Sequence, residues 1–187
     1  MQRNMIFSLI FIVGFALCQA EITPEDKAKI EEYKKIYKQA LEVVQTNRTL
    51  KLVQVTSTLR TKVAACLTSD FISIVQGGVT RTLGSKREGS SPAMTVYVAL
   101  DHSTSFPVTP KLQIHGVRGE VPPGWDETEF IKYAGKDCLI IQPVNFRQGN
   151  LPCLIWAFDG SNECTSEYKN QCKEKSVVAD MHSCEWQ

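Results

Sequence analysis

The chain has 187 residues, with 21 lysines and arginines against 20 aspartates and glutamates, and its net charge at pH 7 is +1. A chain of this length is the size of one domain and can bury a substantial core. Its charges form no basic block or acidic tail, which argues against a protein that binds nucleic acid through an electrostatic patch.

Residues 1–20 are typical of a secretory signal peptide. Arg3 gives a positive start, residues 5–17 are apolar, and Cys18-Gln19-Ala20 places small residues at a cleavage site. The apolar run is shorter than the about 20 residues that span a bilayer. We therefore expect cleavage after Ala20, a single domain over residues 21–187, secretion, and no membrane association of the mature chain.

Six cysteines remain after this cleavage, at positions 66, 138, 153, 164, 172 and 184. An even number behind a signal peptide predicts three disulfides formed in an oxidising compartment. No pair has the C-x-x-C spacing of a zinc knuckle, so no metal is expected. Asn47-Arg48-Thr49 is a sequon and predicts a glycan on Asn47 in a secreted chain.

The mature chain opens with an expected amphipathic helix. Thr23 is suited to cap it, Pro24 to the first helical position, and Asp26 to a capping box. Apolar residues then recur every three or four positions, at Ile30, Tyr33, Tyr37, Leu41 and Val44. This face is expected to pack on the protein's own domain.

From residue 49 to residue 158, short runs rich in Val, Ile, Thr and aromatic residues alternate with turn residues, which is typical of an all-β domain. The expected strands are 50–58, 63–75, 79–83, 94–100, 111–117, 128–133, 138–144 and 153–158. Eight antiparallel strands close into a barrel with room for side chains or for one small ligand.

A second helix is expected from residue 162 to about 173, with Ser161 as its cap. Cys164, Tyr168 and Cys172 fall on one face of it, so two disulfides would clamp this helix to the barrel wall. If Cys138 and Cys153 reach the helix, they point outward from the barrel. Alternation then places five neighbouring residues inside, namely Leu139, Ile141, Leu154, Trp156 and Phe158.

The sequence resembles the tick salivary lipocalins, the family that includes the histamine-binding proteins. The resemblance rests on Lys136-Asp137-Cys138-Leu139-Ile140-Ile141, on Cys153-Leu154-Ile155-Trp156, and on Cys164, Tyr168, Cys172 and Cys184. It implies a lipocalin barrel, secreted in saliva, that sequesters host mediators or modulates host immunity. It also implies the pairs Cys66–Cys184 and Cys138–Cys164, which leaves Cys153–Cys172.

Two substitutions bear on the ligand. The amine-binding members carry acidic residues where this chain has Leu139 and Leu154. A buried ammonium without a carboxylate partner is costly, so we expect a sterol, fatty acid or eicosanoid in contact with the five inward residues. A carboxylate-bearing lipid would need a basic residue at the mouth, for which Lys111 and Arg118 are candidates.

Two alternatives remain open. The first is binding of a biogenic amine such as histamine or serotonin, as in the family. The second is an immunomodulator that binds a host immune protein through its outer surface, which a filled barrel would favour. No enzyme and no cofactor are expected, because His102, His115 and His182 accompany no nucleophile motif. The carboxylates of Asp126, Glu127 and Glu129 are expected in a solvated loop or at a strand edge.

Overall fold

The computed structural model describes residues 23–102, 110–117, 128–144, 152–172, 175–178 and 184. The expected signal peptide, Arg118, Asp126, Glu127 and His182 lie outside these residues, as does the side chain of His102. The chain divides into two units between Glu32 and Tyr33, and the second unit contains the barrel. None of the described helices is long and apolar enough to cross a membrane.

Helix α2 spans Pro24–Gln45 and begins as predicted. The Thr23 hydroxyl accepts a hydrogen bond from the Asp26 backbone N–H at 3.1 Å and donates one to the Asp26 carboxylate at 2.7 Å. The Thr23 backbone N–H also donates to this carboxylate at 3.3 Å, which completes the expected capping box. In the second unit, Ala40, Val43 and Val44 of α2 are buried in the core of the barrel.

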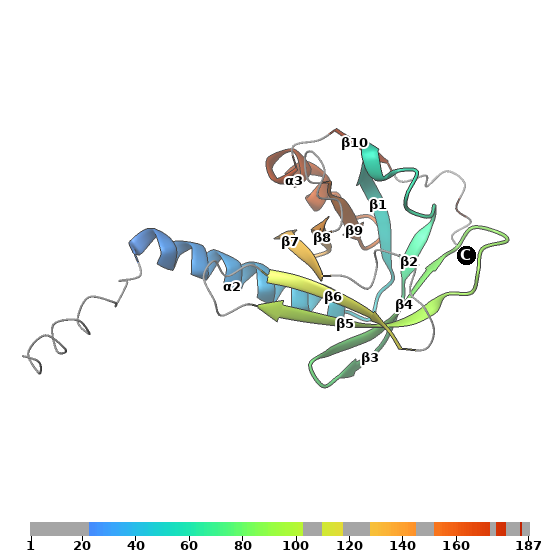
Figure 1. The fold of residues 1–187 in the computed structure, drawn as a ribbon, viewed down its shortest axis with the longest axis horizontal. Coiled ribbons are helices and arrows are strands. Elements are labelled where there is room, and N and C mark those ends of the chain that lie inside the picture. The colour runs from blue at the N-terminus through green and yellow to red at the C-terminus, as the bar shows by residue number, and fades with distance from the viewer. Residues whose placement is uncertain are drawn as a thin grey trace, which may run out of the picture. The chain divides into compact units, whose positions relative to one another are not determined.

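The sheet closes into the predicted antiparallel barrel of eight strands (Figure 1). Its order is β1-β2-β4-β5-β6-β7-β8-β9, and β9 pairs with β1 to complete the circle. The bounds are β1 Leu50–Thr56, β2 Leu67–Ser69, β4 Gly78–Ser85, β5 Met94–His102, β6 Pro110–Gly116, β7 Thr128–Ala134, β8 Cys138–Pro143 and β9 Leu154–Ala157. Strand β10 (Ser176–Val178) pairs with the end of β1.

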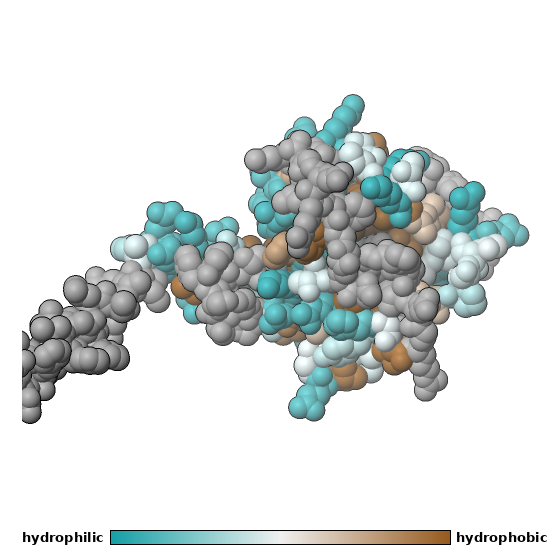
Figure 2. All heavy atoms as spheres, viewed as in Figure 1, coloured by the Kyte–Doolittle hydropathy of each residue, from teal (hydrophilic) through white to brown (hydrophobic). Residues whose placement is uncertain are grey.

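The strand expected at 63–75 is divided in the structure. A 3-10 helix, η1 (Ser57–Leu59), follows β1, and β2 begins only after Cys66, whose φ of +56° lies in the left-handed region. The chain leaves the ladder at Asp70 and continues as β3 (Phe71–Val75), which pairs with β4 alone among the described strands. Ile72 and Ile74 of β3 are 47% and 62% exposed, and Figure 2 shows hydrophobic surface in this region.

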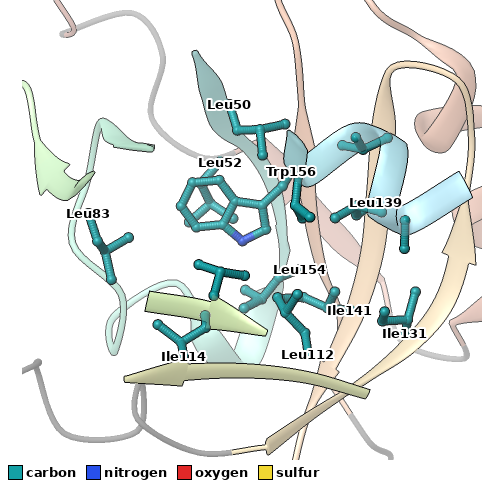
Figure 3. Close-up of a cluster of buried hydrophobic side chains, with 14 of the residues drawn as sticks. Leu50, Leu52, Leu83, Leu112, Ile114, Ile131, Leu139, Ile141, Leu154 and Trp156 are labelled. Atoms are coloured by element: carbon teal, nitrogen blue, oxygen red, sulfur yellow. The ribbon is translucent and has the colours of Figure 1, made fainter. Parts of the chain in front are cut away.

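Residues alternate between two buried clusters on the two faces of the barrel wall. The inner cluster contains Leu50, Leu52, Leu139, Trp156 and the α2 residues, and Figure 3 shows its side chains directed toward one another. The outer cluster contains the residues that alternate with them on β8 and β9 and the face of helix α3. The barrel has two ends. Helix α2 packs at the end where β1 begins, and we call this the α2 end. We call the other one the opposite end.

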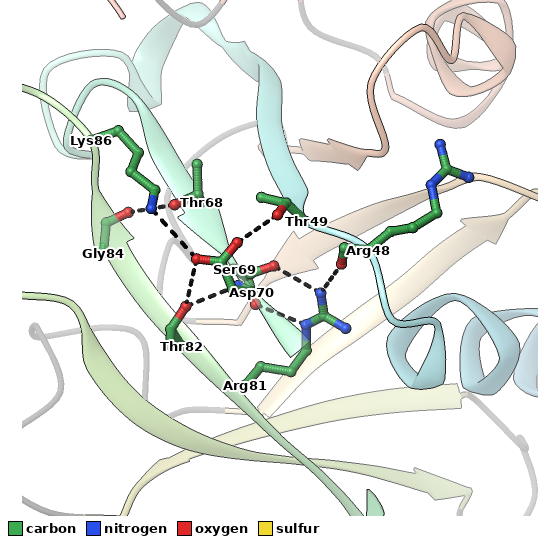
Figure 4. Close-up of polar contacts among 9 residues, drawn as sticks. All are labelled: Arg48, Thr49, Thr68, Ser69, Asp70, Arg81, Thr82, Gly84 and Lys86. Carbon is green, nitrogen blue, oxygen red and sulfur yellow. Dashed lines mark hydrogen bonds and ion pairs between the residues drawn. The ribbon is translucent and has the colours of Figure 1, made fainter. Parts of the chain in front are cut away.

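Arg81 of β4 joins α2 to the α2 end of the barrel (Figure 4). Its side chain is fully buried and donates hydrogen bonds to the backbone carbonyls of Val44 at 2.8 Å, Thr46 at 3.2 Å and Arg48 at 2.6 Å. It also bonds the hydroxyl and carbonyl oxygens of Ser69 at 3.0 and 2.7 Å. Burial lowers the pKa of the guanidinium to about 10, against the opposing effect of the Asp70 carboxylate, so it is charged at neutral pH.

Asp70 fixes the break between β2 and β3. Its carboxylate accepts hydrogen bonds from the hydroxyls of Thr49 at 2.5 Å and Thr82 at 3.3 Å and lies 3.6 Å from the Lys86 ammonium. Burial by itself would raise the pKa of Asp70, but the Thr49 bond, the charge of Lys86 and the Thr82 bond act in the opposite direction. The net pKa lies below its ordinary value.

Helix α3 (Glu163–Gln171) is clamped against the outer face of the barrel, as predicted. The disulfides Cys138–Cys164 and Cys153–Cys172 join it to β8 and to the start of β9, and Cys66–Cys184 makes the third bridge. These are the pairs that the resemblance implies. The capping position is Asn162 rather than Ser161. The carboxylate of Glu163 ties the first turn to the barrel by accepting hydrogen bonds from Tyr133 Oη and Lys136 N, both at 2.9 Å.

Replacing Arg81 by methionine would leave several buried carbonyl oxygens without a donor. We expect the free energy of unfolding to fall by at least about 3 kcal/mol, since each unsatisfied buried group costs about 1–3 kcal/mol. Denaturant titration followed by tryptophan fluorescence, with the disulfides intact, measures this loss. Arg87→Met, on an exposed loop residue, should change it by less than about 0.5 kcal/mol. Equal effects of the two variants would contradict the anchoring role.

The lowered pKa of Asp70 makes stability depend on pH. Because the folded-state pKa lies below the unfolded one, ionised Asp70 stabilises the fold at neutral pH, and this contribution is lost as the pH falls through the folded-state pKa. The free energy of unfolding should therefore fall more steeply between about pH 5 and pH 2 in the wild type than in Asp70→Asn. Parallel pH profiles for the two proteins would rule out the contribution.

Candidate functional site

A small apolar cavity lies inside the barrel next to α2. Its volume is about 40 Å³, and its lining comes from α2, β1, β2, β4, β5, β6, β8 and β9, namely Val44, Leu50, Ser69, Arg81, Leu83, Val96, Val98, Leu112, Ile114, Leu139 and Trp156. Two of the five predicted ligand-binding residues, Leu139 and Trp156, line this cavity. Ile141, Leu154 and Phe158 are buried in the same cluster but do not line it.

The volume limits what the cavity can hold as it stands. A cavity needs about 10–15 Å³ of this kind of volume for each water molecule, so it has space for two or three waters. Pockets for drug-sized ligands measure about 300–1,000 Å³. The inner cluster therefore fills most of the barrel, and a ligand of sterol size would have to displace side chains in order to enter it.

A much larger groove lies at the opposite end of the barrel. Its volume is about 710 Å³, and it is lined by the β1–β2 connection and by the ends of β2, β4 and β5 with their loop. The lining residues are Lys62, Ala64, Leu67, Leu83, Gly84, Ser85, Gly89, Ser90, Ser91, Pro92 and Met94. Leu83 lines both the groove and the inner cavity, so the two spaces are neighbours across this side chain.

Glu129 corrects the sequence-based expectation of a solvated carboxylate. It lies on β7 and is 2% exposed. Its partner in the ladder is Leu112 of β6, which lines the inner cavity. Directly paired residues of antiparallel strands lie on the same face, so Glu129 faces the barrel interior. The interior therefore holds a carboxylate, although both positions occupied by acids in the amine-binding proteins are leucines here.

Two other polar candidates, Lys111 and His115, lie on the outside of the barrel. Lys111 alternates with the inward Leu112 and pairs opposite Asp101, which is exposed, at the α2 end. Lys111 is therefore far from the groove, and Lys62 is the cation that lines it. His115 is exposed. Among the described residues, no three His, Cys, Asp or Glu side chains gather where they could hold a metal ion.

Two further predicted features lie near the α2 end. Phe158 is buried there beneath the Arg48 guanidinium, which sits 4.3 Å from the ring centroid and pairs with Asp137 at 2.8 Å. Phe158 thus makes a cation–π contact, and its role in ligand binding stays a prediction. Asn47 is exposed in the turn between α2 and β1, so its side chain is accessible to a glycan, and glycosylation stays a prediction.

Comparisons with known proteins support the fold. No family model and no curated protein sequence matches this chain. Its structure is similar to that of Japanin from Rhipicephalus appendiculatus, solved with bound cholesterol, with a TM-score of 0.53 and 17% sequence identity. The match covers 75% of this chain and 97% of that one. Since Japanin is a tick salivary lipocalin, the likeness shows that this chain has a lipocalin-like fold.

The small volume of the inner cavity predicts that it accepts only one or two additional carbon atoms. Val98→Leu adds one methylene group toward this space and should leave the free energy of unfolding unchanged or raise it by up to about 1 kcal/mol. Val98→Ala should lower it by about 1–2 kcal/mol. Denaturant titration measures both. A loss of more than about 2 kcal/mol in Val98→Leu would show that the cavity is already filled.

Proposed function

We propose that this protein is a secreted lipocalin-like carrier that sequesters a small, predominantly hydrophobic molecule, such as a sterol, fatty acid or eicosanoid. In this role it would remove a host mediator and so help its source organism evade host defence. The observation that carries the proposal is the apolar interior of the barrel, which adjoins a groove of ligand size across Leu83. The cholesterol bound to Japanin, a protein of the same fold, supports a ligand of this class.

Secretion is part of the proposal. The three disulfides join distant parts of the chain, as in proteins of oxidising compartments, and they support the cleavage of residues 1–20 that the sequence predicts. A protein outside the cell could meet both small mediators and host proteins.

A second candidate is the binding of a biogenic amine. Glu129 favours it, because a buried carboxylate on the inner face could pair with an ammonium group in place of the acids absent at positions 139 and 154. The small volume of the cavity argues against large amines but less against histamine.

A third candidate is direct action on a host immune protein through the outer surface. The nearly filled barrel favours it, as expected for a barrel that serves as a scaffold. Exposed Ile72 and Ile74 on β3 would give such a surface an apolar part.

Calorimetric titration with cholesterol, oleate and histamine distinguishes these candidates. We expect micromolar or tighter affinity for at least one lipid and weak binding or none for histamine. Glu129→Gln should leave lipid affinity unchanged and should abolish any histamine binding that depends on the carboxylate. Tight histamine binding lost in Glu129→Gln would establish the amine candidate. Binding of no small molecule would leave the surface-acting candidate.

A further inference from the structure

Strand β3 has an edge that no other described strand covers, although the main ladder of the barrel closes on itself. Closure of a barrel normally removes such edges, which otherwise invite pairing with another chain. We propose that β3 pairs edge to edge with β3 of a second copy of this chain, antiparallel and across a two-fold axis, so that the protein forms a reversible dimer. This inference does not depend on the proposed carrier function.

The residues of β3 lack the charges and prolines that commonly protect an edge strand. Its five residues, Phe71–Val75, are four apolar residues and one serine. Ile72, Ile74 and Val75 are 47%, 62% and 37% exposed. Figure 1 shows the β3–β4 hairpin projecting from the barrel wall, with β3 at its free margin. The exposed apolar area makes it favourable to cover this edge with another apolar strand.

The β3–β4 hairpin is already held in the extended shape that such pairing requires. A two-residue turn, Gln76-Gly77, joins the two strands, and Gly77 supplies its positive φ of +81°. Tyr97 of the adjacent β5 donates a hydrogen bond to the Gln76 carbonyl at 3.2 Å. The hydroxyls of Ser73 and Thr80 are hydrogen-bonded at 2.6 Å across the ladder. A preformed edge loses little conformational entropy when a second strand pairs with it.

The sequence of β3 is suited to pairing with itself, because its apolar residues are arranged symmetrically about Ser73. An antiparallel pair centred on Ser73 places Ile72 of each copy opposite Ile74 of the other. It also places Phe71 of each copy opposite Val75 of the other. Directly opposed residues share one face of the sheet, and apolar pairs of this kind stabilise it. A two-fold axis forms each of these contacts twice, as in homodimers generally.

The charges that flank β3 favour the antiparallel direction. Asp70 immediately precedes the strand, and its carboxylate lies 3.6 Å from the Lys86 ammonium of the same chain. Antiparallel pairing centred on Ser73 places Asp70 of one copy opposite the uncharged Gln76 of the other. Parallel pairing would bring the two Asp70 carboxylates side by side, and like charges directly opposite each other are destabilising. A second copy can therefore meet this edge without charge repulsion.

Sedimentation equilibrium of the disulfide-bonded protein measures the dimer. Because β3 is short compared with interfaces of about 800 Å² per partner, we expect a dissociation constant on the order of 10–100 μM. Ile74→Lys places a charge on the edge and should weaken the dimer by at least about tenfold. Val117→Lys, at a 48% exposed position after β6, should leave it unchanged. A wild type that is monomeric at about ten times the expected constant, or a dimer that Ile74→Lys does not weaken, would overturn the proposal.

Ser73→Cys tests the register of the pairing. The two Cα atoms at this position would lie about 4.5–5.5 Å apart, within the distance of about 4.4–6.8 Å that a disulfide spans. Mild oxidation should therefore link this variant into a covalent dimer, seen by non-reducing electrophoresis. Thr80→Cys is the matched control, because Thr80 pairs directly with Ser73 but lies one strand farther from the axis. Equal cross-linking of the two variants would contradict the register.

A strand from a different protein is the other possible occupant of this edge. A synthetic peptide of alternating valine and threonine is a probe for such strand addition. A wild type that stays monomeric but binds this peptide, with loss of binding in Ile74→Lys, would overturn the dimer and assign β3 to a foreign strand. Unchanged denaturation midpoints of the Ile74→Lys and Ser73→Cys proteins verify that both are folded.

Discussion

The buried guanidinium of Arg81 is the interaction on which the arrangement of the barrel depends. Helix α2 has no basic residue in its last turn, so its final carbonyl oxygens receive hydrogen bonds from a strand of the barrel instead. The charge can remain buried because oxygen atoms from α2, the following turn and β2 surround it. One side chain thereby ties the C-terminal end of the helix and the following turn to the barrel at the α2 end.

The two faces of the barrel wall have separate roles that follow from simple alternation. On β8 and β9, Leu139 and Trp156 pack inward, while Cys138 and Ile155 pack outward beneath α3. The two bridges that hold α3 therefore cross only the outer layer and take no volume from the interior. The attachment of α3 is therefore separate from the packing of the inner cluster.

Much of this architecture was predictable from the sequence, because strand alternation and helix capping are local patterns. The helix over 24–45, the barrel and the inward side of Leu139 and Trp156 follow from such patterns. The inward position of Arg81 could also have been predicted, because it alternates with Val79 and Leu83 along the strand. A charged residue, however, is not expected in a core. Glu129 was misplaced for the same reason, because it alternates regularly with Ile131 but a carboxylate is not expected in a core. The groove depends on two loops that meet only in three dimensions, and no local pattern indicates it.

The closure of the barrel also determines when, during synthesis of the chain, the first strand can form its full pairing. β1 has its main partner in β9, and Lys51 pairs with Ala157, so more than a hundred residues must be synthesised before the first strand can complete its ladder. Cys66 lies 118 residues before its disulfide partner, Cys184, in the sequence. During translation the emerging chain thus presents an open, unfinished sheet with unpaired thiols. Until β9 has been made, the edges of this sheet stay open to pairing with other chains.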